Sequence, residues 1–203
     1  MTAWVGVLGT HGWPDIPEQA WWHRASPFAR FLAQQGLQPA RPETPFVWSG
    51  DLQGVPFFGA GKDWEAGAQA LRYYLEDLPY ESRNVIAHSH GGQVALLCAV
   101  DLPLRSLVMV GTPVRKDIER RIAPVAARQI GRCLHLSDAK WDWMGLGGAL
   151  FDRRLSFRRT FRVPGIVCEQ VHGIGHSGIL RDERLFPLWL EHGWINALRV
   201  EKV

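Results

Sequence analysis

One short segment restricts the fold of this chain more than any other. Within Val85–Ala99, an apolar run leads to Ser89, and the helix-compatible run Gln93–Ala99 follows at once. Ala87 and Gly91 stand two residues before and two residues after this serine. Small side chains at those positions let a strand and a helix pass close to each other at a sharp turn. The segment therefore predicts a strand–turn–helix unit with a strained serine, whose hydroxyl projects clear of the sheet.

The rest of the chain alternates short apolar runs with longer helix-compatible segments. This alternation predicts an α/β fold with three layers (α/β/α), in which a mostly parallel sheet of about six strands is covered on both faces. A length of 203 residues suits a single domain spanning 1–203. The expected strands are Ala3–Leu8, Pro45–Trp48, Asn84–Ala87, Ser106–Val110, Cys133–Leu136 and Ile166–Cys168. The expected helices are Ser26–Gln35, Trp64–Leu78, Gly92–Val100, Asp117–Ile130 and Leu185–Val200.

Local signals predict the ends of one helix and the cellular compartment of the protein. Ser26 followed by Pro27 predicts a capped helix start, and Gly36 predicts its end. Three cysteines without metal-ligand spacing favour reduced thiols in a cytoplasmic protein. No apolar run is long enough to span a bilayer, and the first residues do not resemble a secretory signal.

The net charge of +3 is modest but unevenly distributed. Two basic tracts lie within Arg115–Arg132 and Arg153–Arg162, and we expect them to form solvated surfaces. No aromatic-interleaved RNA motif or zinc finger accompanies them, so nucleic acid is not an expected partner.

The turn around Ser89 resembles the nucleophile elbow of the α/β-hydrolase family, whose pattern is G-x-S-x-G, with Ala87 in place of the first glycine. The resemblance implies that Ser89 is a nucleophile and that the backbone amide of His90 is one donor of an oxyanion hole. The loop after the first expected strand resembles the His-Gly oxyanion loop of lipases and esterases. It implies that the second donor is the amide of Thr10 or His11.

In this family the nucleophile, the acid and the histidine follow one another in that order. Two candidate acids, Asp138 and Asp142, follow the expected strand that ends at Leu136. The family spacing favours Asp142, and Asp138 is the alternative, with a role as an Asx-type cap of the turn. The Gly-His-Ser context after the last expected strand favours His176 over His172 as the general base.

The chain departs from larger family members in two ways. We expect the usual two leading strands to be missing from this sequence, because the strand expected to carry the oxyanion loop comes first in it. The segment between Val110 and Cys133 is too short for a large helical lid, so the helix expected there is at most a minimal cap.

Aromatic residues accompany the expected catalytic edge. Trp13, Trp22 and Trp143 are predicted to line a pocket for the substrate, because large apolar rings favour binding of an acyl or aromatic group.

The resemblance implies a serine hydrolase of carboxylesterase or lipase type that needs no cofactor and acts on a small-molecule acyl ester. Whether the bond is an ester, thioester or amide stays open, as does the oligomeric state. Two alternatives remain. One is a metal-dependent hydrolase in which His88 and His90 bind a metal with His11 or His176; we expect no metal. The other is a hydrolase-fold binding module without catalysis.

Overall fold

The computed structural model describes residues 2–7, 20–46, 63–138, 156 and 158–199. All neighbouring strands of its six-stranded sheet are parallel, and their order is β2-β1-β3-β4-β5-β6. The predicted α/β class with a parallel sheet is therefore confirmed, and the carboxyl ends of all six strands lie at one edge of the sheet. The strands are β1 (Thr2–Val7), β2 (Leu37–Pro39), β3 (Asn84–His88), β4 (Leu104–Val110), β5 (Ile130–Asp138) and β6 (Ile166–Val171).

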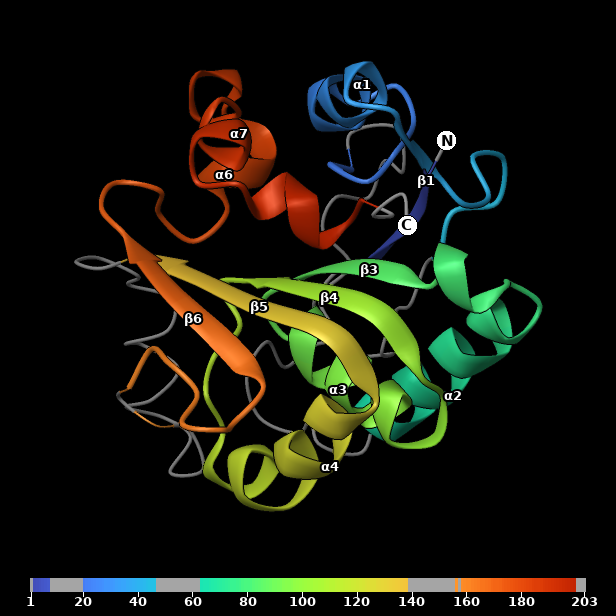
Figure 1. Cartoon of the computed structure of the whole chain (residues 1–203), viewed down its shortest axis with the longest axis vertical. Helices are drawn as coiled ribbons and strands as arrows, with labels where there is room; N and C mark the ends of the chain where they lie inside the picture. Colours follow the sequence, from blue (N-terminus) through green and yellow to red (C-terminus); the bar gives the residue numbers. More distant parts are fainter. Residues whose placement is uncertain (1, 8–19, 47–62, 139–155, 157, 200–203) are drawn as a thin grey trace, which may run out of the picture.

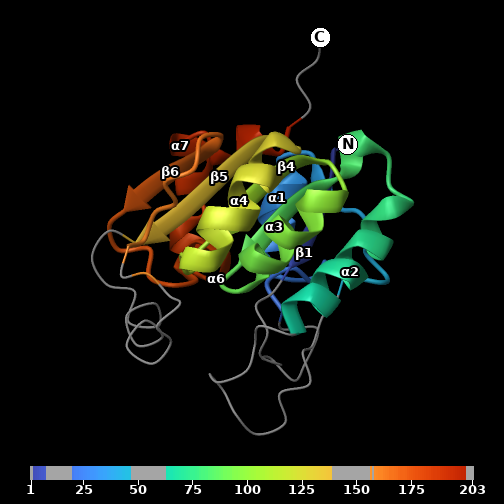
Figure 2. The same ribbon diagram turned by 90° about the horizontal axis from the view of Figure 1, so that it is seen from below.

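Helices cover both faces of the sheet (Figure 1). The helices α1 (Pro27–Gln34), α6 (Gly178–Arg181) and α7 (Leu188–Glu191) lie on one face, and α2 (Asp63–Glu76), α3 (Gly91–Asp101) and α4 (Ala123–Arg128) lie on the other. Figure 2, seen from below, shows α2, α3 and α4 side by side in front of the sheet. No helix among the described residues is long and apolar enough to cross a membrane.

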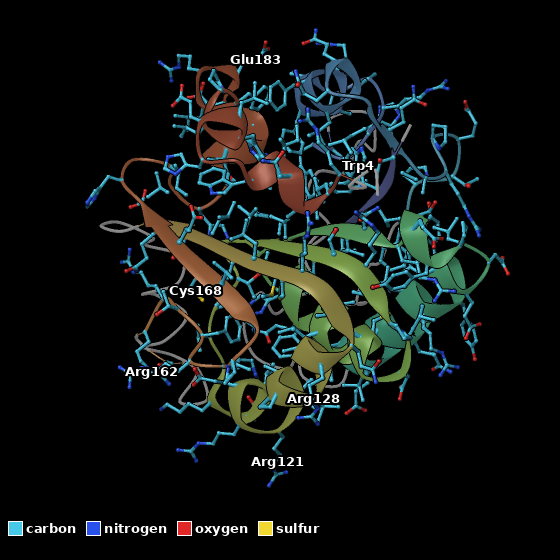
Figure 3. All side chains as sticks on the ribbon, in the orientation of Figure 1. Trp4, Arg121, Arg128, Arg162, Cys168 and Glu183 are labelled. Carbon is cyan, nitrogen blue, oxygen red and sulfur yellow. The ribbon has the colours of Figure 1, made fainter. Side chains whose placement is uncertain are left out.

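The sheet separates two apolar clusters, and β3 shows why. Val85 and Ala87 pack into the cluster under α2, α3 and α4, whereas Ile86 packs into the cluster under α1 and the C-terminal helices. Successive side chains of a strand point to opposite faces, so a strand covered on both faces needs apolar residues at every position. In the second cluster Trp4 stacks on Trp21, and Figure 3 shows Trp4 between β1 and α1.

The start and the end of α1 confirm the predicted signals. The Oγ of Ser26 accepts a hydrogen bond from the amide of Ala29 at 3.0 Å, and Pro27 occupies the first turn. After α1 the chain turns at Gly36, whose φ is +78°. The amide of Thr2 donates to the carbonyl of Gly36 at 3.1 Å, which brings the residues after the helix onto β1.

That turn explains why the edge strand beside β1 lies elsewhere than the sequence suggested. The strand beside β1 is β2, directly after the turn, whereas the described part of Pro45–Trp48, namely Pro45 and Phe46, belongs to no strand. A three-residue edge strand depends on pairing with its neighbour rather than on its own sequence pattern, so the apolar run downstream was the stronger but misleading signal.

Two predicted helices are also shorter than expected. The segment expected at Leu185–Val200 contains α7 and a 3-10 turn, Trp194–Ala197, separated by Gly193 with φ +68°. The segment expected at Asp117–Ile130 begins as a π-helix, Ile118–Ile122, and continues as α4, and its last residue, Ile130, already belongs to β5.

The basic tracts are only partly solvated. Arg121, Arg128 and Arg162 are exposed, and Figure 3 shows Arg121 and Arg162 at the periphery of the protein. In contrast, Arg115 is buried and pairs with Asp117, its Nη2 lying 2.6 Å from Oδ2. The expectation of solvated surfaces was therefore wrong for Arg115, whereas Arg158 is partly exposed and pairs with Glu119.

Candidate active site

The strand–turn–helix unit predicted around Ser89 is present between β3 and α3. Ser89 has φ +54° and is the only non-glycine residue with positive φ in the part of the chain that the structure describes. Its amide donates to the carbonyl of Val110 at 2.9 Å, and its carbonyl accepts from the amide of Gly92 at 3.1 Å. A left-handed conformation costs a residue other than glycine about 1–2 kcal/mol, so it persists only where surrounding contacts enforce it.

A glycine after the turn makes the close approach of α3 to β4 possible. A Cβ on Gly92 would lie 2.2 Å from the Oγ1 of Thr112, which follows β4. No side chain can therefore stand at this position without moving the loop after β4. The sharp turn and the loop next to it are packed as one unit.

His90 is the N-cap residue of α3, so its amide lies at the amino end of that helix. The His90 ring stacks on the ring of Trp64 at a centroid distance of 5.1 Å. The guanidinium of Arg115 also packs on Trp64, 4.4 Å from its ring centroid. These contacts fix the side chain of His90 while its backbone stays beside Ser89. Thr10 and His11, the expected second oxyanion donors, lie outside the described residues.

His176 lies in the loop between β6 and α6. Gly173 and Gly175, with φ of +79° and +58°, shape this loop. The Nε2 of His88 lies 3.2 Å from the carbonyl oxygen of His176, and the two rings meet edge to face at a centroid distance of 4.9 Å. The structure thus brings His176 against the residue that precedes Ser89, whereas His172 is exposed.

Asp138 also contacts the loop that carries His176. It is the last residue of β5, it is buried, and its Oδ2 accepts a hydrogen bond from the amide of Gly175 at 2.7 Å. Asp142, the acid favoured by the sequence, lies outside the described residues. The structure therefore places one of the two candidate acids next to the histidine loop and describes no position for the other.

Buried polar side chains that sequence analysis missed form hydrogen bonds to the loop after β4. The Nε2 of His135 lies 3.0 Å from the carbonyl of Thr112, and the Nε2 of Gln93 donates to the carbonyl of Pro113 at 2.5 Å. Burial lowers the pKa of His135 to about 4. This histidine is neutral at physiological pH, with its proton on Nε2, because a carbonyl can only accept.

Of the three tryptophans predicted to line a pocket, the structure describes only Trp22. Trp22 is nearly buried and packs on the backbone of Gly6, where a Cβ would lie 2.3 Å from the Cβ of Trp22. It lies in the core rather than on a rim. Trp13 and Trp143 lie outside the described residues. Among the described residues, no group of three or more His, Cys, Asp or Glu side chains could hold a metal ion, so no ligand set around His88 and His90 is seen there.

Two of the residues that shape the site were missed for different reasons. Gly111, directly after β4, has φ +59° and lies against His176. A glycine ending a predicted strand was a visible signal for a tight turn. The burial of His135 inside β5 had no signal, because a histidine in a strand is equally compatible with either face.

This combination of an all-parallel sheet, a strained serine after β3 and a histidine loop after β6 is an α/β-hydrolase fold. Solved structures support this assignment. A predicted CIB-like hydrolase from Thermoplasma acidophilum shares 15% identity with a TM-score of 0.57, over 96% of this chain and 86% of that chain.

MGS-MChE2, an α/β-hydrolase enzyme from the metagenome of sediments of the Mar Chica lagoon in Morocco, shares 16% identity with a TM-score of 0.51. The match covers 96% of this chain and 90% of that chain. No family model and no curated protein matches the sequence.

Proposed function

We propose that this protein is a serine hydrolase of esterase type, with Ser89 as nucleophile, His176 as general base and acid, and Asp142 as the acid that orients His176. The observation that carries the proposal is the strained backbone of Ser89, with φ +54°, at a turn whose preceding residue contacts His176. The two solved structures described above are both named as hydrolases, which supports the same class of activity.

The proposed reaction has two halves. In the first, His176 takes the hydroxyl proton of Ser89, the oxygen attacks the acyl carbon, and the leaving alcohol receives the proton from His176. In the second, His176 takes a proton from water, the water oxygen attacks the acyl-enzyme, and His176 returns the proton to the oxygen of Ser89 as the acid is released. The backbone amide of His90, with that of Thr10 or His11, stabilises the negative oxygen in both halves.

The acid has two candidates with different support. The family spacing favours Asp142. Asp138 is favoured by its hydrogen bond to Gly175, which directly precedes His176. The Nδ1 of His176, which an orienting acid must reach, would be only 3.1 Å from a Cβ at Gly111, so it faces the end of β4, next to β5. Asp138 ends β5, and Asp142 comes four residues later in the sequence. In our proposal Asp138 anchors the loop and Asp142 holds the imidazole.

The substrate we propose is a small-molecule acyl ester. Trp13 and Trp143 are the candidates for contacting its acyl or alcohol group, and no cofactor takes part in the proposed reaction.

Labelling with a fluorophosphonate probe tests the nucleophile. We expect the wild-type protein to be labelled and Ser89→Ala to lose both labelling and hydrolysis of acyl esters of varied chain length. Ser82→Ala is a matched control, because Ser82 lies just before the amino end of β3, at the opposite end of the strand from Ser89. Unchanged labelling of Ser89→Ala would refute the assignment. Wild-type protein that neither reacts nor hydrolyses any ester would favour a binding module.

A further inference from the structure

We infer that His88 is a positioning residue that holds the loop of His176 over Ser89. This inference rests on the proposed function, because it assigns a role within the same site. His88 lies at the carboxyl end of β3, directly before Ser89. The contact between residues 88 and 176 therefore links the base to the strand that carries the nucleophile.

The geometry defines what His88 contributes. The Nε2 atom of His88 lies 3.2 Å from the carbonyl oxygen of His176. A carbonyl oxygen only accepts hydrogen bonds, so Nε2 carries the proton and donates. The ring of His88 also meets the ring of His176 at an interplanar angle of 64° and a centroid distance of 4.9 Å. One side chain thus restrains both the backbone and the imidazole of His176.

The loop needs such a restraint because its glycines allow many backbone conformations. Gly173 and Gly175 flank Ile174 with positive φ values, and glycine loses the most conformational freedom when it is fixed. His88 donates to His176 itself, whereas Asp138 accepts from the neighbouring Gly175. The two contacts come from β3 and β5, on either side of β4.

A glycine, Gly111, lies next to the carbonyl of His176, where any larger residue would clash. A Cβ on Gly111, at the end of β4, would lie 2.6 Å from the carbonyl oxygen of His176. This is the same oxygen that accepts from His88. The carbonyl therefore lies between the His88 donor on β3 and the backbone of Gly111 directly after β4.

Loss of the donor should reduce the rate of the chemical step more than substrate binding. A misplacement of about 1 Å in a catalytic group can cost about a hundredfold in rate. His176 acts on Ser89 in the transition state, so a displaced imidazole lowers kcat, whereas KM changes little.

Two substitutions of equal polarity separate the donor from simple packing. In His88→Gln the amide nitrogen stands where Nε2 stood, so it still reaches the carbonyl of His176. In His88→Asn the shorter side chain places its amide nitrogen near the Nδ1 position, so it does not reach. We expect His88→Gln to retain kcat within about threefold and His88→Asn to lose about tenfold to a hundredfold, with KM of both near the wild-type value.

The measurement is kcat and KM on a soluble acyl ester, together with the rate of fluorophosphonate labelling. His172→Asn is the control for the same loop, since His172 is exposed, and it should behave as wild type. Thermal unfolding of each variant shows that the compared proteins are folded. Equal kcat values for the Gln and Asn variants would overturn the role of the donor, as would a loss confined to KM. Fluorophosphonate labelling of Ser89→Ala separates this inference from the proposed function. If that variant is not labelled, Ser89 remains the nucleophile even where the His88 variants contradict the role of His88.

Discussion

The two ends of β3 use polar residues in opposite ways. At the amino end, Asn84 is completely buried, and its Nδ2 donates to the carbonyls of Ala3 and Glu81 at 2.8 and 3.0 Å. Its Oδ1 accepts from Arg105 and Ser106 at 2.9 and 2.8 Å. Every donor and acceptor of this amide is paired within the protein, so the group stabilises the fold and offers nothing to a ligand.

At the carboxyl end, the same strand continues into a turn with a strained backbone. Ser89 is partly exposed with φ +54°, and His176, opposite, is also partly exposed. Two glycines near Ser89 leave room for close neighbours, Gly92 for the side chain of Thr112 and Gly111 for the carbonyl of His176. Strain and partial exposure, rather than polarity, distinguish the candidate site from a structural polar cluster.

The largest expected effect concerns the acid at the carboxyl end. Asp142→Asn should lower turnover by about a thousandfold or more, because the amide no longer holds the required tautomer of His176. Asp138→Asn should lower turnover far less but weaken the loop that contains Gly175. Ester hydrolysis and thermal unfolding of both variants provide the measurement. The reverse ranking would make Asp138 the catalytic acid.

The next effect tests the close packing at Gly111. Gly111→Ala places a methyl group 2.6 Å from the carbonyl of His176 and strains a backbone with φ +59°. We expect kcat to fall about a hundredfold as the loop moves. Gly36→Ala is the control, because that glycine also has positive φ but no atom within 4 Å of its added Cβ. Equal activity of the two variants would show that the site tolerates displacement of His176.

A smaller effect concerns pH and the buried support of the loop. The folded-state pKa of His135, about 4, is below its unfolded value of 6.5, so the unfolded state binds its proton first as the pH falls. This contribution to stability is complete above the unfolded pKa and is lost as the pH falls toward the folded value. Between pH 7.5 and pH 5 the free energy of unfolding should fall by about 2 kcal/mol from this group.

Denaturant unfolding at both pH values checks this expectation. In His135→Gln the free energy of unfolding should depend less steeply on pH, whereas the exposed His172→Gln should keep the wild-type slope. An unchanged slope in the first variant would show that His135 is not buried as a neutral group.

The smallest effect lies at the amino end of β3. Ser106→Ala removes one of the two donors to the Oδ1 of Asn84 and leaves Arg105 in place. The free energy of unfolding should fall by about 1 kcal/mol, with unchanged kcat and KM. A change in kcat here would contradict the division of β3 into a structural and a functional end.

The elbow, most strands and the order of the candidate residues could be predicted because their signals are local. Ala87, Gly91 and the apolar run before them specify a strand and a turn within a few residues. Buried strands such as β4 and β5 read as continuous apolar runs, and all five expected helices overlap observed helices or helical turns over at least part of their length. The misplaced edge strand and the interrupted C-terminal helix depended on pairing and on turns that a periodic pattern does not contain.

The sequence by itself determined where along the chain a strained serine, a candidate general base and a turn of small residues would lie. Only the tertiary structure decided which of them meet. His88, Gly111 and Asp138 surround the loop of His176 because parallel strands bring their carboxyl ends together, although these residues are separated from His176 by 88, 65 and 38 positions of the sequence. Contacts over such separations depend on strand order and register, which no local pattern of side chains specifies.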